Sequence, residues 1–191
     1  MTDADRKAEL QSYLRGARDA LVWKLDGLGE YDIRRPLTPT GTNLLGLVKH
    51  STASHLTYFG EVFGRPCEKP SWLGSDAEPY AQFWAAPDES RDDVVTGYRR
   101  AGDLADETIR DLPLDAVGTV WWWGDASATL HHVIVHVTAD TQRHAGHADI
   151  IRELIDGSVG MLDGADNLHI RDPAEQQRFR DRVEAAAAQF R

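Results

Sequence analysis

Cysteine and long apolar runs are the two features that this sequence most clearly lacks. Cys67 is the only cysteine among 191 residues, which excludes an internal disulfide and a zinc site built from several cysteines. No stretch approaches the ~20 consecutive apolar residues that a membrane-spanning helix needs. The N-terminal stretch MTDADRKAELQS has no apolar core behind a basic start, so it does not resemble a secretory signal. We therefore expect a cytoplasmic protein with no membrane partner.

Basic residues are also in short supply. The chain has 21 lysines and arginines against 31 aspartates and glutamates, which gives a net charge of −10. A protein that binds nucleic acid usually gathers Lys and Arg on one face to neutralise phosphates. Here the bases are interleaved with acids, as in RDPAEQQRFRDR. The pattern predicts a solvated acidic surface, and we expect no nucleic acid partner.

Strand signals are nearly absent, and helical periodicity covers most of the chain. Helices are predicted over residues 4–28, 44–63, 91–111 and 127–155, and a shorter one from Pro173 to the C-terminus. Thr42 or Asn43 is suited to cap the second helix, and Gly157 to end the fourth. The segment 65–90 is too rich in Pro, Gly and acidic residues for a strand. We therefore predict a single all-α domain over residues 1–191, a four-helix bundle with an additional short C-terminal helix.

One face of the fourth predicted helix carries polar side chains between apolar ends. Positions that alternate steps of four and three share this face. They are Val133, Val137, Asp140, His144, His147, Ile151 and Leu154. Burying the carboxylate and the imidazoles without partners would cost several kcal/mol. These polar groups must therefore interact with one another, with water or with a metal ion.

Asp140 and His144 stand at i and i+4, so their side chains can converge on one point. Two ligands from one helix and one from a facing helix are a common metal site in bundles. Imidazole and carboxylate suit Zn²⁺, and also Ni²⁺, Fe²⁺ or Mn²⁺. The same spacing is frequent in weak surface ion pairs. Spacing alone therefore leaves both interpretations open.

Two segments resemble a known family. HVTADTQRHAGHADIIRELIDG, residues 136–157, is similar to the last bundle helix of the DinB-like metalloprotein superfamily, and more narrowly to an actinobacterial subfamily filed as a domain of unknown function. NLLGLVKHSTASHLTYFG resembles the first ligand-bearing helix, in which a histidine follows a short Leu/Val run. The resemblance implies a DinB-like bundle whose metal triad is His50, Asp140 and His144.

The triad also resembles that of the N-terminal domain of mycothiol-dependent maleylpyruvate isomerase, which has a carboxylate at the middle position. That acid is usually Glu there, whereas this chain has the shorter Asp140. The isomerase's second domain is not expected, because only about 35 residues follow Gly157.

The second predicted helix offers two histidines as the third ligand. On a helical wheel of residues 44–63, the apolar arc consists of Leu44, Val48, Phe59 and Val62. His55 falls inside this arc, so periodicity alone favours His55 as the inward histidine. His50 lies at the margin, and the resemblance favours it. We expect His50 to be the ligand, because a metal facing a solvent-filled cleft is served by a marginal position, and His55 is the alternative.

Other residues are candidates for the chemistry around the metal. His147, one turn beyond His144, is the predicted catalytic proton carrier, and a buried structural histidine is the alternative. Arg143 and Tyr58 are predicted to bind the cosubstrate, Arg143 through an anionic group and Tyr58 near the metal. Residues 121–123, three adjacent tryptophans, are predicted either to line a pocket mouth or contact a partner, or to pack over the bundle.

Two classes of function remain open. The resemblance implies a metal-dependent S-transferase or isomerase that joins a low-molecular-weight thiol, mycothiol, to a small electrophile. Zinc is the first choice of metal and nickel the second, and metal-dependent hydrolysis is the chemical variant. The other class is a non-catalytic or stress-associated metal-binding bundle. A homodimer is compatible with either class.

Overall fold

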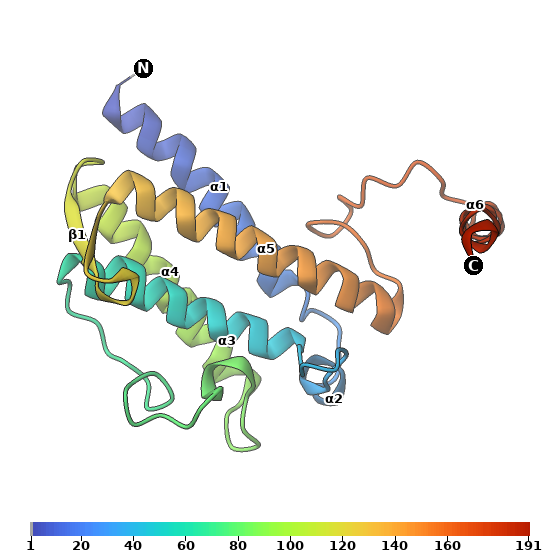
Figure 1. Ribbon diagram of the computed structural model, residues 1–191, viewed down its shortest axis with the longest axis horizontal. Helices are drawn as coiled ribbons and strands as arrows, with labels where there is room; N and C mark the ends of the chain where they lie inside the picture. The colour runs from blue at the N-terminus through green and yellow to red at the C-terminus, as the bar shows by residue number, and fades with distance from the viewer. Residues whose placement is uncertain (1) are drawn as a thin grey trace.

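Four long helices lie side by side in the computed structural model, which describes residues 2–191 (Figure 1). They are α1 (Asp3–Trp23), α3 (Leu44–His55), α4 (Arg91–Asp111) and α5 (Leu130–Asp156). α1 packs mainly on α5, and α3 packs on both α4 and α5. The predicted all-α four-helix bundle is therefore confirmed. Among residues 2–191, none of the helices is both long and apolar enough to cross a membrane.

Side-chain caps set where the bundle helices begin. Asn43 caps α3, because its Oδ1 accepts a hydrogen bond from the Gly46 N–H at 2.7 Å. Of the two predicted caps, Thr42 and Asn43, the structure therefore has Asn43. The hydroxyl of Ser90 caps α4 in the same way, and that of Thr129 caps α5. α5 ends as predicted at Gly157, whose φ of 79° is the left-handed conformation that favours glycine at this position.

The core consists of two apolar clusters along the bundle axis. The first, near the start of α5, includes the fully buried side chains Leu14, Phe59, Ile134 and Val137. The second, toward the end of α5, includes Leu21, Ile33, Leu45, Val48 and Ala148. Burial of each large aliphatic or aromatic side chain stabilises the fold by roughly 1.5–3 kcal/mol.

A small β-hairpin replaces the predicted start of the fourth helix. β1 (Val117–Val120) pairs antiparallel with β2 (Ala126–Thr129), and η4 (Trp121–Trp123) forms the tip. The prediction of helix from residue 127 was therefore wrong, since α5 begins at Leu130. Gly118 explains the hairpin's position, because a Cβ there would overlap the backbone oxygen of Val62. Burial of Val120 and Ala128 on one side holds it against the bundle.

The predicted second helix is continuous but changes its winding. After α3 the chain continues as the π-helical turn η1 (Leu56–Gly60) and the 3₁₀ turn η2 (Glu61–Phe63). The first helix is shorter than predicted, because residues after Trp23 form turns that include Gly27 at a φ of 76°. Segment 65–90 is irregular as predicted, with only the 3₁₀ turn η3 (Ala81–Phe83).

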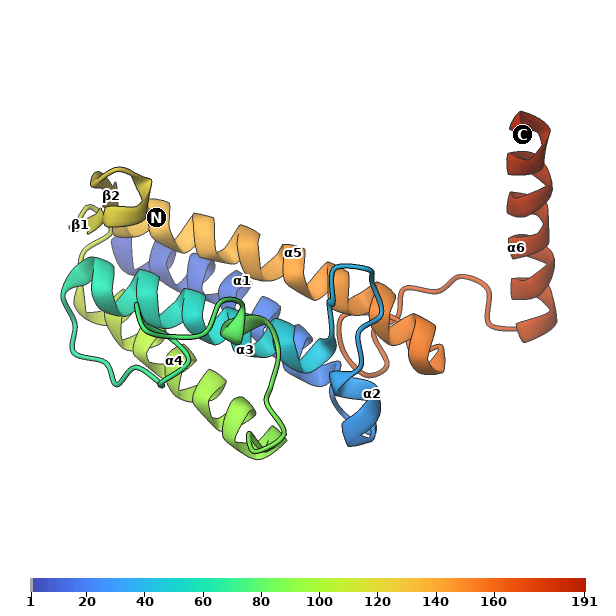
Figure 2. The same ribbon diagram turned by 60° about the horizontal axis from the view of Figure 1, so that its bottom comes forward.

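Two further helices lie outside the four-helix core. The short α2 (Glu30–Arg34), which was not predicted, lies at one end of the bundle. The predicted C-terminal helix is α6 (Pro173–Ala187), with Pro173 in its first turn, followed by the 3₁₀ turn η5 (Ala188–Phe190). α6 lies apart from the bundle in both views, and its residues are exposed (Figure 2). The assignment of all 191 residues to one domain stays a prediction.

Candidate metal centre

The polar face predicted on α5 lies beside the buried face, not within it. The buried residues of α5 are Leu130, Val133, Ile134, Val137, Thr141, Ala145, Ala148, Ile151 and Arg152. Asp140 and His144 are only half-buried, and His147 and Leu154 are exposed. Of the predicted face, Val133, Val137 and Ile151 are buried but His147 and Leu154 are not, because steps averaging 3.5 residues drift around a helix of 3.6 residues per turn. The alternative of a buried structural histidine at 147 was wrong for the same reason.

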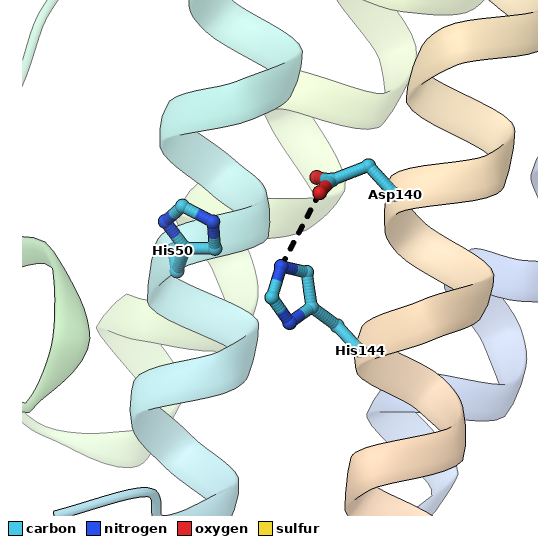
Figure 3. A group of neighbouring side chains, drawn as sticks. All are labelled: His50, Asp140 and His144. Carbon is cyan, nitrogen blue, oxygen red and sulfur yellow. Dashed lines mark ion pairs between the residues drawn. The ribbon is translucent and has the colours of Figure 1, made fainter. Parts of the chain in front are cut away.

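Three predicted residues meet across the gap between α3 and α5. His50 on α3 faces Asp140 and His144 on α5 (Figure 3). One nitrogen or oxygen atom from each side chain lies within 4.8 Å of the other two. His144 Nε2 is 3.4 Å from Asp140 Oδ1. Within residues 2–191, no second group of three or more His, Cys, Asp or Glu side chains meets in this way.

The surroundings of His50 and Asp140 suit a metal ion. His50 Nδ1 lies 3.1 Å from Gln82 Oε1, and because an amide oxygen only accepts, the proton sits on Nδ1 and leaves Nε2 free. Burial lowers the pKa of His50, which keeps the ring neutral. The hydrogen bond from His144 lowers the pKa of Asp140, which keeps the carboxylate ionised. Metal binding requires these forms of histidine and aspartate.

The donor set therefore fits a divalent cation. Two imidazoles and one carboxylate are ligands that zinc accepts, and three protein ligands leave a coordination position open, as in catalytic zinc sites. Ser54 Oγ donates a hydrogen bond of 3.4 Å to Asp140 Oδ2 and so orients the carboxylate from the α3 side.

His55, the alternative ligand, lies outside this group. Its side chain is fully buried, and its Nδ1 donates to the backbone oxygen of Ser51 at 2.7 Å. The ring packs edge-on against Tyr98 of α4, with centroids 5.7 Å apart. Burial lowers the pKa of His55 to about 4. The helical wheel was right that His55 points inward, but that direction leads to the core.

Sequence analysis missed His136, which lies one turn before Asp140 on α5. The hydroxyl of Tyr58 is 3.0 Å from His136 Nε2 and accepts a hydrogen bond from Trp122 Nε1 at 3.3 Å. Because the indole only donates, the Tyr58 hydroxyl keeps its own proton available for His136. Burial lowers the pKa of His136. The signal was available, since residues 132, 136, 140 and 144 are spaced by four and are three histidines and one aspartate.

The tryptophans and the other candidates lie at different depths. Trp122 and Trp123 pack against Tyr58, with ring centroids 5.0 and 5.8 Å away, whereas Trp121 is exposed. Packing over the bundle is therefore confirmed for two of the three. Arg143 is exposed on α5.

Comparison with known proteins bears on this site. The model of a protein family described as Mycothiol-S-transferase matches residues 9–157. This chain belongs to the mycothiol-S-transferase family. The match contains all three triad residues and ends where α5 ends, so α6 lies outside it. Mycothiol-S-transferases are a DinB-like metal-binding family, which confirms the superfamily resemblance. No curated protein matches the chain.

Proposed function

We propose that this protein is a metal-dependent S-transferase that joins the thiol of mycothiol to a small electrophile, with His50, Asp140 and His144 as the metal ligands. The observation that carries the proposal is the convergence of these three side chains within a chain of the mycothiol-S-transferase family. Zinc is the first choice of metal and nickel the second, because both accept imidazole together with carboxylate. The narrower relationship to the maleylpyruvate isomerase branch is part of the same proposal.

The chain's own residues hold the ligands in place. Gln82 fixes the tautomer of His50, and Phe83 stacks on the His50 ring with centroids 4.7 Å apart and planes at 24°. When bound, the divalent cation supplies Lewis acidity, which lowers the pKa of a thiol beside it. The single carboxylate of Asp140 leaves the site with a net positive charge, which favours the thiolate form of the cosubstrate.

His147 is the proposed acceptor of the thiol proton. Its exposed ring lies 5.7 Å from that of His144, centroid to centroid. In the transfer, the sulfur forms a bond to the electrophilic carbon and the thiol proton passes to the imidazole. A leaving group departs with its electron pair, or in an addition the proton returns to the product. General-base assistance of this kind is worth roughly 10²–10⁴ in rate.

Arg143 and Tyr58 are the proposed cosubstrate-binding residues. Arg143 presents its charge to solvent beside His144, where it is accessible to a polar or anionic group of the thiol. The Tyr58 ring is buried against the tryptophans, and its hydroxyl faces His136. Tyr58 would therefore act at the edge of the site nearest Asp140, whereas Arg143 would act from the solvent side.

Metal content and thiol-dependent turnover together test the proposal. Elemental mass spectrometry of untagged protein should find close to one equivalent of zinc or nickel in the wild type and in His169→Ala, which changes an exposed histidine beyond the bundle. His144→Ala and Asp140→Ala should lose the metal and the mycothiol-dependent consumption of an electrophile.

Two results would contradict the proposal in different ways. A wild-type protein that takes up no metal after incubation with Zn²⁺ and Ni²⁺ would leave the triad as a polar seam. A protein that binds metal at the triad but shows no thiol-dependent turnover would instead support the non-catalytic alternative.

A further inference from the structure

A cavity of about 490 Å³ opens beside the triad, and its lining differs from the rest of the surface. The loop before α3 and the first turn of α3 form one side, and His144 and His147 of α5 form another. Three aromatic side chains, Tyr80, Phe83 and Trp84, form the third. The lining contains no Lys, Arg, Asp or Glu, although the chain as a whole is rich in charged residues. The cavity is therefore suited to an uncharged molecule.

The aromatic wall is held rigidly although it belongs to an irregular segment. The backbone oxygen of Phe83 lies so close to α3 that a Cβ at Gly46 would overlap it. Asn43 Nδ2 donates to the same oxygen at 3.2 Å, and Lys49 Nζ donates to the backbone oxygen of Trp84 at 3.0 Å. Preformed walls reduce the entropy that a ligand must lose on binding.

Two observations indicate that this wall serves a ligand. The side chains of Tyr80, Phe83 and Trp84 are 76%, 41% and 43% exposed, and neighbouring exposed aromatics usually mark a binding site. Tyr80 also has a φ of 67°, a left-handed conformation that is unfavourable for a bulky aromatic residue. Backbone strain of this kind is kept mainly at functional sites.

Phe83 connects the cavity to the metal ligands. Phe83 forms part of the aromatic wall, and its ring also stacks on that of His50. His144 similarly belongs to both the triad and the cavity lining. A molecule in the cavity is therefore next to the place where, under the proposed function, the thiolate is held.

We propose that this cavity binds the electrophilic cosubstrate and selects neutral, planar, aromatic electrophiles over anionic ones. This inference rests on the proposed function. The aromatic wall attracts a planar ring by stacking and burial of apolar surface. A carboxylate or sulfonate would lose its hydration without meeting a Lys or Arg among the lining residues.

A matched pair of unreactive probes tests the selectivity without turnover. 2-Naphthol and 2-naphthalenesulfonate have the same ring system and differ in charge, and a sulfonate is a weak metal ligand. Isothermal titration at pH 8 on the metal-loaded protein, without mycothiol, should find 2-naphthol bound at least about tenfold more tightly. Equal affinity, or tighter binding of the sulfonate, would overturn the inference.

Variants place the probe in the cavity. Tyr80→Ala and Trp84→Ala should each weaken 2-naphthol binding by about five- to tenfold, and Trp84→Phe should keep most of the affinity. Tyr13→Ala removes a similarly exposed aromatic from α1, outside the cavity lining, and should bind as the wild type does. Wild-type affinity in both alanine variants would show that the probe binds elsewhere and would overturn the inference.

Turnover separates this inference from the proposed function. With 1-chloro-2,4-dinitrobenzene, the mycothiol sulfur forms a bond to the ring carbon and chloride leaves, while the thiol proton is released. Trp84→Ala should raise KM for this electrophile about fivefold and leave metal content unchanged. Mycothiol-dependent turnover with an unchanged KM would overturn the pocket assignment and keep the proposed function. Binding of 2-naphthol in the cavity without any mycothiol-dependent turnover would overturn both the function and the cavity's role in it.

Discussion

The buried side chain of His55 should make the stability of the protein depend on pH in the range where histidines titrate. The ordinary pKa of histidine is 6.5, and in the folded protein the pKa of His55 is lowered to about 4. The main cause is burial, which disfavours the imidazolium. A folded pKa below the unfolded one means that acid adds a proton preferentially to the unfolded chain. The free energy of unfolding is therefore highest above pH 6.5 and falls as the pH falls toward 4.

The size of this effect follows from the two pKa values. At 1.36 kcal/mol for each pH unit between 6.5 and about 4, the loss amounts to roughly 3 kcal/mol. A typical domain has only about 5–15 kcal/mol of stability in total, so a loss of this size is measurable by urea unfolding. The measurement requires a chelator throughout, because acid would also remove a metal from the triad.

His55→Gln isolates this contribution, because glutamine is polar and does not titrate. The variant should be less stable than the wild type by about 1–3 kcal/mol at pH 7.5, since a buried hydrogen bond is disturbed. Between pH 7.5 and pH 4, the free energy of unfolding of the wild type should fall by roughly 3 kcal/mol more than that of the variant, because only the wild type loses this stability. His169→Gln, at an exposed position, should show the same dependence of unfolding free energy on pH as the wild type. If His55→Gln also shows that dependence, the buried neutral histidine is not its cause.

Gly46→Ala should destabilise the protein by about 1–3 kcal/mol in urea unfolding, because its Cβ would overlap a loop carbonyl, whereas Gly97→Ala, with open space around it, should not. A neutral Gly46→Ala would contradict the close packing of the aromatic wall. Tyr58→Phe should leave the pKa of His136 below its ordinary value of 6.5 in an NMR titration, because burial is the main cause of its lowering, and a return to 6.5 would show that the Tyr58 hydroxyl is the cause instead. Gln82→Leu should weaken metal binding at the α3 ligand by about 10–100-fold in competition with a chelator, and equal affinity would show that this contact is not needed.

Local signals were sufficient to predict most of the bundle. α4 has the predicted bounds because Ser90 caps its start and Pro113 follows its end. Gly157 ends α5 because only the left-handed conformation closes that helix. The hairpin before α5 could not be predicted in this way. β2 reads ASAT, which has little strand propensity, and it pairs because Gly118 allows close approach to the chain at Val62.

The meeting of His50, Asp140 and His144 was predictable to different degrees. Helical spacing alone predicts that Asp140 and His144 converge, because i and i+4 side chains share a face, but it leaves a metal site and an ion pair both open. His50 required the family resemblance, since periodicity identifies the centre of the apolar arc, and a ligand that faces a cleft lies at its margin. The centre of that arc belongs to His55, whose neutral ring packs in the core.

The aromatic wall could not be predicted from the sequence, because segment 65–90 has no helical or strand periodicity. Tyr80, Phe83 and Trp84 are placed by contacts with α3 that are distant in sequence, such as those of Asn43 and Lys49. The same stretch supplies Gln82, which fixes the tautomer of His50. One segment thus orients His50 and forms the wall of the neighbouring cavity. A substitution at Phe83, which stacks on His50 and also lines the cavity, should therefore change metal affinity together with electrophile selection, whereas substitutions at Tyr80 and Trp84 should change electrophile selection alone.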